Sequence, residues 1–418
     1  MNTLDLMAWL LFFTAGFSYL NHRFLKLPAS IGVMAISLVF SLGLLLGGVT
    51  GLLPDLEASA EALLSGLDFE KLVLHGMLGA LLFAGALHIN LEDLAQQKWI
   101  ITLLATFGVL LSTALIGGLT YVLAGVLGLG LPFIYCLLFG SLISPTDPIA
   151  VLSIMKTAGA PKELETKIAG ESLFNDGIAV VVFLVILGIA TGESEPTFGS
   201  IAILFLEEAV GGALFGLAVG YIAYRMMKSI DEYRVEVLIT LALVFCGYAL
   251  AETLHVSAPI AAVTAGLMIG NHGRSFAMSD TTVEHVDTFW ELVDEILNAV
   301  LFVLLGLEVL ILTFQGSHLL AGVLAIPVVL TSRLAGVSLP VLLLKWKREF
   351  PRHTIRILTW GGLRGGISVA LALSIPVSPE RNVLLTMTYV VVIFSILVQG
   401  LTIGGLIQNA FSEDKPAA

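Results

Sequence analysis

Long apolar runs alternate with short polar or Gly/Pro-containing interruptions along nearly the whole chain. A helix needs about 20 mostly apolar residues to cross a bilayer. This pattern predicts about thirteen transmembrane helices, at residues 3–20, 29–49, 71–90, 99–127, 131–156, 164–191, 198–228, 235–254, 257–271, 288–313, 318–344, 354–374 and 381–410. We therefore expect an all-α, polytopic membrane protein.

The composition agrees with this interpretation and excludes several classes of function. The chain is 57% hydrophobic and 12% charged, whereas soluble domains carry about 25% charged residues. Its net charge is −12, and no basic patch lies outside short loops, which argues against nucleic-acid binding. Cys136 and Cys246 lie in apolar segments, so we expect neither a disulfide nor a metal site from them.

The basic residues predict how the spans are oriented. Cytoplasmic loops of membrane proteins are enriched in Lys and Arg. With the N-terminus outside, Lys71 and Arg381 fall outside, and Arg333 and Arg364 fall within the membrane. The other sixteen fall inside: Arg23, Lys26, Lys98, Lys156, Lys162, Lys167, Arg225, Lys228, Arg234, Arg274, Lys345, Lys347, Arg348, Arg352, Arg356 and Lys415. We expect a multi-pass protein of the plasma (inner) membrane with a cytoplasmic C-terminus. Because no basic region precedes the first apolar run, we expect a first span rather than a signal peptide.

Two of the predicted spans are interrupted in their middle. Prolines break the fifth at residues 144–148, and a glycine-rich stretch that contains Arg364 breaks the twelfth at residues 360–366. Interrupted helices in corresponding positions of two inverted repeats indicate the substrate site of a transporter. The chain therefore divides into a first repeat of about 3–191, a linker helix of about 198–228, a second repeat of about 235–410 and a short cytoplasmic tail, 411–418.

Acidic residues occur in the middle of two of these apolar spans. Asp147 lies in Ser-Pro-Thr-Asp-Pro and Asp176 in Glu-Ser-Leu-Phe-Asn-Asp-Gly. An ionisable group at this depth costs roughly 3 kcal/mol on insertion scales and indicates function. At about 100° per residue, Glu171, Ser172, Asn175 and Asp176 share one side of their helix. Carboxylate, hydroxyl, amide and free carbonyl oxygens are ligands of a hard cation such as Na⁺.

The intramembrane arginines suggest that the acids have different roles, depending on whether an acid is paired with an arginine. An arginine beside a carboxylate favours its ionised form, so a paired acid is a poor proton carrier. One acid must then remain able to bind and release a proton. If a proton and a cation compete for that acid, exchange is obligatory. A buried polar network that only locks helices together is the alternative interpretation.

The combined motifs resemble a known family. Ser-Pro-Thr-Asp-Pro (144–148), Glu-Ser-Leu-Phe-Asn-Asp-Gly (171–177), the segment around Arg333 and Gly-Gly-Leu-Arg-Gly-Gly (361–366) resemble the cation/proton antiporters of the NhaP type and the animal sodium/proton exchangers. The resemblance covers nearly the whole chain. It implies a homodimer with a rigid dimerisation half and a mobile six-helix core that moves like an elevator. It also implies that Na⁺ and H⁺ are transported and that no cofactor is needed.

By this resemblance, Asp176 binds either Na⁺ or H⁺. The Na⁺ site would be completed by Thr146, Ser172 and Asp147, together with a carbonyl of the unwound stretch. Asn175, which precedes the key acid, is typical of the electroneutral branch and implies one-for-one exchange.

The resemblance also implies supporting roles for three charged residues. Glu171 would pair with Arg333 and brace the core, with Asn175 nearby. Arg364 would balance buried charge at the crossing helices, where helix ends face each other.

One departure and several alternatives stay open at this point. Some relatives carry a further acid on the third span, which here has none at its middle. His272 and His285 are either pH sensors or parts of a solvated loop. Glu207 and Glu208 either lie in a water-filled outer cavity or indicate that the seventh span starts later than residue 198. Li⁺ or K⁺ could replace Na⁺ as the cargo, and a potassium-selective antiporter is a further alternative. A channel, a sensor or an intramembrane aspartyl protease is disfavoured, the protease because its Gly-x-Gly-Asp setting is missing. We expect a transporter without catalytic residues.

Overall fold

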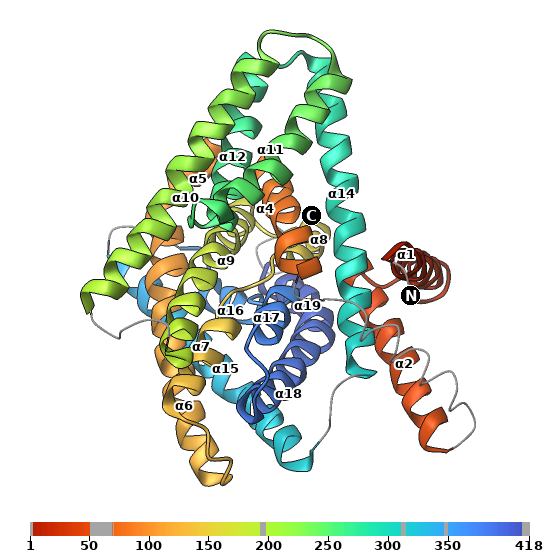
Figure 1. Ribbon diagram of the computed structural model, residues 1–418, viewed down its shortest axis with the longest axis vertical. Coiled ribbons are helices and arrows are strands. Elements are labelled where there is room, and N and C mark those ends of the chain that lie inside the picture. The colour runs from red at the N-terminus through yellow and green to blue at the C-terminus, as the bar shows by residue number, and fades with distance from the viewer. Residues whose placement is uncertain are drawn as a thin grey trace, which may run out of the picture.

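The computed structural model describes residues 3–50, 69, 71–192, 198–310, 315–346 and 350–411. Every regular element within these residues is helical, apart from one isolated bridge between Asp147 and Leu363. The expected all-α fold is therefore confirmed (Figure 1).

The first half of the chain contains the helices α1 Thr3–Leu20, α2 Ala29–Val49, α4 Leu78–Leu87, α5 Leu91–Leu103, α6 Val109–Val126, α7 Phe133–Ile143, α8 Ile149–Ala158 and α9 Lys162–Thr191. The second half contains α10 Phe198–Met227, α11 Tyr233–Thr253, α12 Ala258–Met268, α13 Arg274–Phe276, α14 Asp280–Leu307, α15 Gly316–Leu344, α16 Thr354–Trp360, α17 Gly366–Leu373, α18 Pro379–Phe394 and α19 Gly400–Phe411. Short π-helical segments, η1 Asn21–Leu25, η2 Lys71–Met77, η3 Leu104–Gly108, η4 Ile269–Gly273 and η6 Ser395–Gln399, and the 3₁₀ turn η5 Glu308–Leu310 adjoin these helices.

Each predicted span overlaps one or more of these helices, and two helices begin earlier than the apolar pattern suggests. α5 starts at Leu91 because the Asn90 side chain accepts hydrogen bonds from the backbone N–H groups of Glu92 and Asp93 (2.8 and 3.2 Å). α14 starts at Asp280, after an N-cap by Ser279. Both caps satisfy N–H groups of a polar first turn. Seven helical stretches of the described chain are long and apolar enough to cross a membrane, and the full number of crossings stays a prediction.

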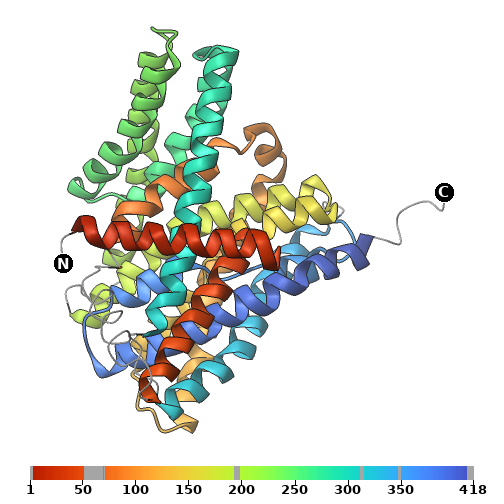
Figure 2. The same ribbon diagram turned by 90° about the vertical axis from the view of Figure 1, so that its right-hand side faces the viewer.

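The helices pack in two groups. The first group consists of α1, α2, α4, α10, α11, α12 and α14, which contact mainly one another. The second group consists of α5 to α9 and α15 to α19. Figure 1 shows α11 and α12 of the first group in green above the blue helices of the second, with the teal α14 running down beside them, and Figure 2 shows α1 lying across α14. The long helix α9 contacts both groups, since it packs on α5 and α7 and also on α10, α12 and α4.

Close approach of backbones holds the second group together. A Cβ atom at Gly140 of α7 would meet the backbone carbonyl of Thr113 on α6. Gly117 of α6 likewise faces Leu137, whose Cα would lie 2.9 Å from an added Cβ. In lipid there is no hydrophobic driving force between helices, so small residues that allow such packing stabilise the bundle.

The two broken helices cross inside the second group. Residues 144–148 separate α7 from α8, and residues 361–365 separate α16 from α17. Pro145 and Pro148 cannot donate backbone hydrogen bonds, which accounts for the first break. At the crossing, the backbone N–H of Asp147 donates to the carbonyl of Leu363 (2.8 Å). The two unwound segments therefore satisfy some of each other's backbone hydrogen-bonding groups.

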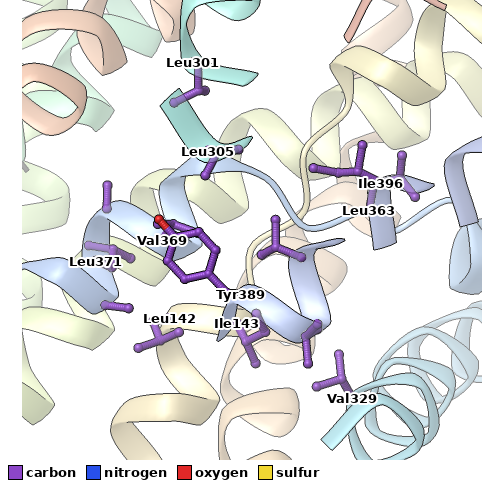
Figure 3. Close-up of a cluster of buried hydrophobic side chains, with 14 of the residues drawn as sticks. Leu142, Ile143, Leu301, Leu305, Val329, Leu363, Val369, Leu371, Tyr389 and Ile396 are labelled. Carbon is purple, nitrogen blue, oxygen red and sulfur yellow. The ribbon is translucent and has the colours of Figure 1, made fainter. Parts of the chain in front are cut away.

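A cluster of buried, mostly apolar side chains surrounds this crossing. Figure 3 shows Leu301 and Leu305 of α14, Leu142 and Ile143 of α7, Val369 and Leu371 of α17 and Tyr389 of α18 around the unwound Leu363 segment. All of them are buried. The polar residues of the crossing are thus enclosed by apolar side chains from four helices.

Candidate ion-binding site

Three of the predicted site residues form one hydrogen-bonded unit. The hydroxyl groups of Thr146 and Ser172 are 2.9 Å apart. Asn175 donates through Nδ2 to the Thr146 hydroxyl (2.9 Å) and accepts the Thr146 backbone N–H at Oδ1 (3.3 Å). All three side chains are buried. In this arrangement Asn175 fixes the position of Thr146, and the two hydroxyl groups remain close together beside the break.

The two intramembrane aspartates lie within electrostatic reach of each other. Asp176 is on α9 and is 5% exposed, while Asp147 is partly buried at the break. The charge of Asp147 acts on the Asp176 carboxyl. Two such carboxylates repel each other in a medium of low dielectric constant. A bound cation or proton would relieve this repulsion.

Glu171 and Arg333 form a two-pronged ion pair. Nη1 of Arg333 donates to Oε1 of Glu171, and Nη2 donates to Oε2 at 2.9 Å. Nη2 also donates to the backbone carbonyl of Leu358 (3.2 Å). Both side chains are buried. Because Glu171 is on α9, Arg333 on α15 and Leu358 on α16, the pair ties three helices of the second group together.

Arg364 lies at the second break and bonds to backbone groups. Its Nη1 donates to the carbonyl of Pro145 (3.3 Å), and its own backbone N–H donates to Oγ of Ser395 (2.9 Å). The guanidinium is buried. It therefore places a positive charge at the crossing and satisfies a carbonyl that the first break leaves free.

Ser395 and Gln399 contribute to the crossing and were missed by the sequence analysis. Gln399 donates through Nε2 to the carbonyl of Trp360, the last residue of α16 (2.9 Å). Both residues belong to η6, a π-helical segment of the kind that is common at functional sites. The sequence does contain a signal for them, because Ser395 and Gln399 are polar and lie four residues apart within the apolar run 381–410.

The residues of α9 that flank Asp176 pack against the first helix group. A Cβ atom at Gly177 would lie 2.7 Å from Cγ1 of Ile260 on α12, and Leu173 reaches to 3.9 Å from the corresponding position of Gly85 on α4. Leu173 belongs to a buried apolar cluster with Leu78, Leu82, Ala86, Ala262, Val263 and Leu267. Asp176 therefore lies at the boundary between the two helix groups, beside a buried apolar contact surface.

The other polar residues noted in the sequence do not join this unit. α4 contains no acid, and His88 at its end is hydrogen-bonded to the carbonyl of Ala84 (2.8 Å). The ring of His285 stacks on Tyr233 at 4.1 Å. His272 is exposed and lies near Phe276.

The structure also explains one of the acids of the seventh predicted span. Glu208 of α10 lies in the electrostatic field of His255, just beyond α11, and of its neighbour Glu207. Its backbone carbonyl accepts the N–H of Ser257, the N-cap of α12 (3.1 Å). Glu208 is therefore part of the junction between α10, α11 and α12.

The first testable consequence concerns Gly365. A Cβ atom there would overlap the carboxyl group of Asp147, with Asp147 Cβ and Cγ both 2.8 Å away. We expect Gly365→Ala to displace the Asp147 side chain and to lower ion flux by about 100-fold, the size of effect that follows an ~1 Å misplacement of a positioned group. Flux is measured in proteoliposomes, at protein levels matched by quantitative staining.

Gly118→Ala is the matched control, because a Cβ atom at Gly118 would meet nothing within 4 Å. It should retain wild-type flux. Normal flux in Gly365→Ala would show that the position of Asp147 is unimportant.

Comparisons with known proteins agree with this architecture. The family model described as "Sodium/hydrogen exchanger, transmembrane" matches residues 9–408. The Na⁺/H⁺ antiporter NhaP of Pseudomonas aeruginosa is 55% identical over 98% of this chain and 97% of its own length. The Na⁺/H⁺ antiporter NhaH of Halobacillus dabanensis is 38% identical over 93% of each chain.

A solved structure shares the fold at low sequence identity. The sodium proton antiporter MjNhaP1 of Methanocaldococcus jannaschii superimposes with a TM-score of 0.75 and is 20% identical, over 97% of this chain and 99% of its own. Because the family model spans nearly the whole chain and two relatives exceed 30% identity, the chain belongs to the sodium/hydrogen exchanger family.

Proposed function

We propose that this protein is a secondary active antiporter that exchanges a monovalent cation, primarily Na⁺, for H⁺ across the membrane. The observation that carries the proposal is the buried Asp176 on α9, one helical turn from Ser172, whose hydroxyl lies 2.9 Å from that of Thr146 at the crossing of two broken helices. The relatives named above as Na⁺/H⁺ antiporters support the same cargo.

Asp176 is the group for which Na⁺ and H⁺ compete. When Asp176 is ionised, its carboxylate, the Thr146 and Ser172 hydroxyls and the Asp147 carboxylate offer the hard oxygen ligands that Na⁺ prefers. When Asp176 is protonated, the negative charge that attracts the cation is gone. Each crossing of the loaded site therefore carries one cargo ion or the other, and exchange follows without a separate gate.

Three charged residues keep the structure around the site unchanged while Na⁺ and H⁺ exchange there: Glu171, Arg333 and Arg364. The Glu171–Arg333 pair is already neutral overall and connects α9, α15 and α16. Arg364 offsets negative charge at the crossing through a guanidinium held by backbone carbonyls. Asp176 is then the acid that is left to change its charge with the cargo.

The two helix groups suggest how the site reaches both sides. In the proposed elevator movement, the second group slides as a unit against the first along the apolar surface beside Asp176. The proposed divisions are a first repeat of about 3–191, a linker helix of about 198–228, a second repeat of about 235–410 and a tail at 411–418. The proposed assembly is a homodimer in the inner membrane, with its N-terminus outside and its C-terminus in the cytoplasm.

Purified protein in proteoliposomes tests the function directly. After a pH gradient has been imposed, addition of Na⁺ should dissipate it, and Li⁺ and K⁺ added in parallel define the selectivity. If only K⁺ were effective, the protein would be a potassium-selective antiporter. Conductance without proton movement would identify a channel, and the absence of any flux would contradict transport.

We further expect one-for-one, electroneutral exchange. Asn175 is neutral and is engaged by Thr146, so Asp176 alone changes its charge with the cargo. The initial rate of Na⁺-driven pH dissipation should be the same when the membrane potential is clamped at zero or at an inside-negative value with K⁺ and valinomycin. A rate that changes with the clamped potential would contradict this stoichiometry.

A further inference from the structure

One face of α14 leads from the crossing of the broken helices toward the start of that helix. At about 100° per residue, Asp294, Asn298, Leu301 and Leu305 fall within about 60° of one another around the helix axis. Figure 3 shows Leu301 and Leu305 projecting from α14 toward the crossing. The Leu301 side chain packs against Gly366, where an added Cβ would lie 2.5 Å from Cδ1 of Leu301. The same face therefore presents Asn298 and Asp294 one and two turns before Leu301.

Asn298 has an unsatisfied oxygen. Its Nδ2 donates to the backbone carbonyl and to Oδ1 of Asp294 (2.8 and 3.1 Å). The residue is 3% exposed, and its own Oδ1 is buried with no hydrogen-bond partner among the described residues. A buried carbonyl oxygen without a partner costs free energy and calls for a specific explanation, such as an ion or a water.

Asp294 differs from the acids beside it on the helix. Glu291 and Glu295 are exposed, whereas Asp294 is partly buried. Asp294 belongs to the first helix group, but its face of α14 leads to the crossing: Leu301, two turns further along, packs on Gly366, and the adjacent Gly365 lies against the Asp147 carboxyl. The charge of Asp147 acts on the Asp294 carboxyl from there. Two carboxyl groups and one free amide oxygen are the ligand types of a hard cation.

We propose that Asp294 and Asn298, together with Asp147, form an entry site that binds a monovalent cation before it reaches Asp176. The inference rests on the proposed antiport function and adds to it a second cation-binding site of lower affinity. The entry site lies toward the N-terminal end of α14, on the side that the charge distribution predicts to be cytoplasmic. Asp294 is on the first helix group and Asp147 on the second. Movement of one group against the other therefore separates the two carboxyl groups and would release the cation from the entry site.

The test is the apparent KM for Na⁺ on each side of the membrane, measured with oriented proteoliposomes. Asp294→Asn should raise the KM by about tenfold on the side of the α14 N-terminus. This is the lower end of the increase in local cation concentration that charges lining a cleft produce. The KM on the opposite side and the maximal rate should remain at wild-type values. Asn298→Ala should raise the same KM, because it removes the unsatisfied carbonyl oxygen.

Glu295→Gln is the matched control, since it removes the same charge one residue away on the exposed side of α14. It should leave both KM values unchanged. Asp294→Glu keeps the carboxylate and should therefore keep the KM near the wild-type value. It serves as the control that a substitution at this position leaves the protein folded.

Two results would overturn the entry site. A wild-type KM in both Asp294→Asn and Asn298→Ala, with exchange intact, would mean that the unsatisfied oxygen holds only water. An equal rise of the KM on both sides would place Asp294 in the central site instead. Failure of the antiport function itself is distinct, because wild-type protein would then show no Na⁺-dependent proton movement.

Discussion

Asp176→Asn is expected to reduce Na⁺-driven dissipation of a pH gradient to the level of protein-free liposomes. Asparagine has nearly the same shape, but it can neither release a proton nor offer a negative charge to Na⁺. Both halves of the exchange are lost together, and the loss should be the same for Li⁺ and K⁺. The measurement is the initial rate of pH recovery in proteoliposomes that contain equal amounts of each protein.

Two controls separate this loss from unfolding. Glu295→Gln removes an exposed acid and should transport normally. The thermal midpoint of Asp176→Asn should be close to that of the wild type, because asparagine has nearly the same shape and places no charge at the buried position. If Asp176→Asn still coupled Na⁺ to protons, another acid would have to be the carrier.

The second large effect concerns the Glu171–Arg333 pair. Removal of one partner leaves a buried charge without compensation, which costs about 3–5 kcal/mol. Glu171→Ala and Arg333→Ala should therefore each lower the thermal midpoint in detergent strongly. The double variant Glu171→Leu with Arg333→Leu should recover much of the loss, since well-packed apolar residues often replace a buried pair without cost.

A surface ion pair provides the comparison. Lys162 and Asp93 are 2.6 Å apart, and the Lys162 side chain is 78% exposed. Asp93→Ala should lower the thermal midpoint far less than Glu171→Ala does, because water screens an exposed pair. If Glu171→Ala were no more destabilising than Asp93→Ala, the buried pair would not brace the three helices.

The positions of the helices were largely predictable because each apolar run had to be long enough for a bilayer. α1 and α2 coincide with the predicted spans 3–20 and 29–49. The two breaks were also predictable, since prolines and clustered glycines interrupt the backbone ladder wherever they occur. The early starts of α5 and α14 were less visible, because their first turns are polar and only Asn90 and Ser279 indicate a cap.

Contacts between distant segments were not predictable in the same way. The sorting of helices into two groups depends on packing partners, and periodicity along one helix does not specify them. Ser395 and Gln399 were overlooked because their partners, the Arg364 amide and the Trp360 carbonyl, exist only where a helix is broken. The same holds for Asp294, because the crossing that contains Asp147 is far away in sequence and is reached from α14 only through the packing of Leu301 on Gly366 of α17.

Competition of Na⁺ and H⁺ for Asp176 is the central claim, and proton release on Na⁺ binding tests it most directly. Purified protein in lightly buffered detergent solution is titrated with Na⁺ while a pH electrode counts the protons set free. Near the pH at which Asp176 is half-protonated, binding should release protons, whereas at high pH binding should persist without release. Asp176→Asn should release none. Saturable Na⁺ binding that releases no proton at any pH would contradict the account, because cation and proton would then occupy separate groups.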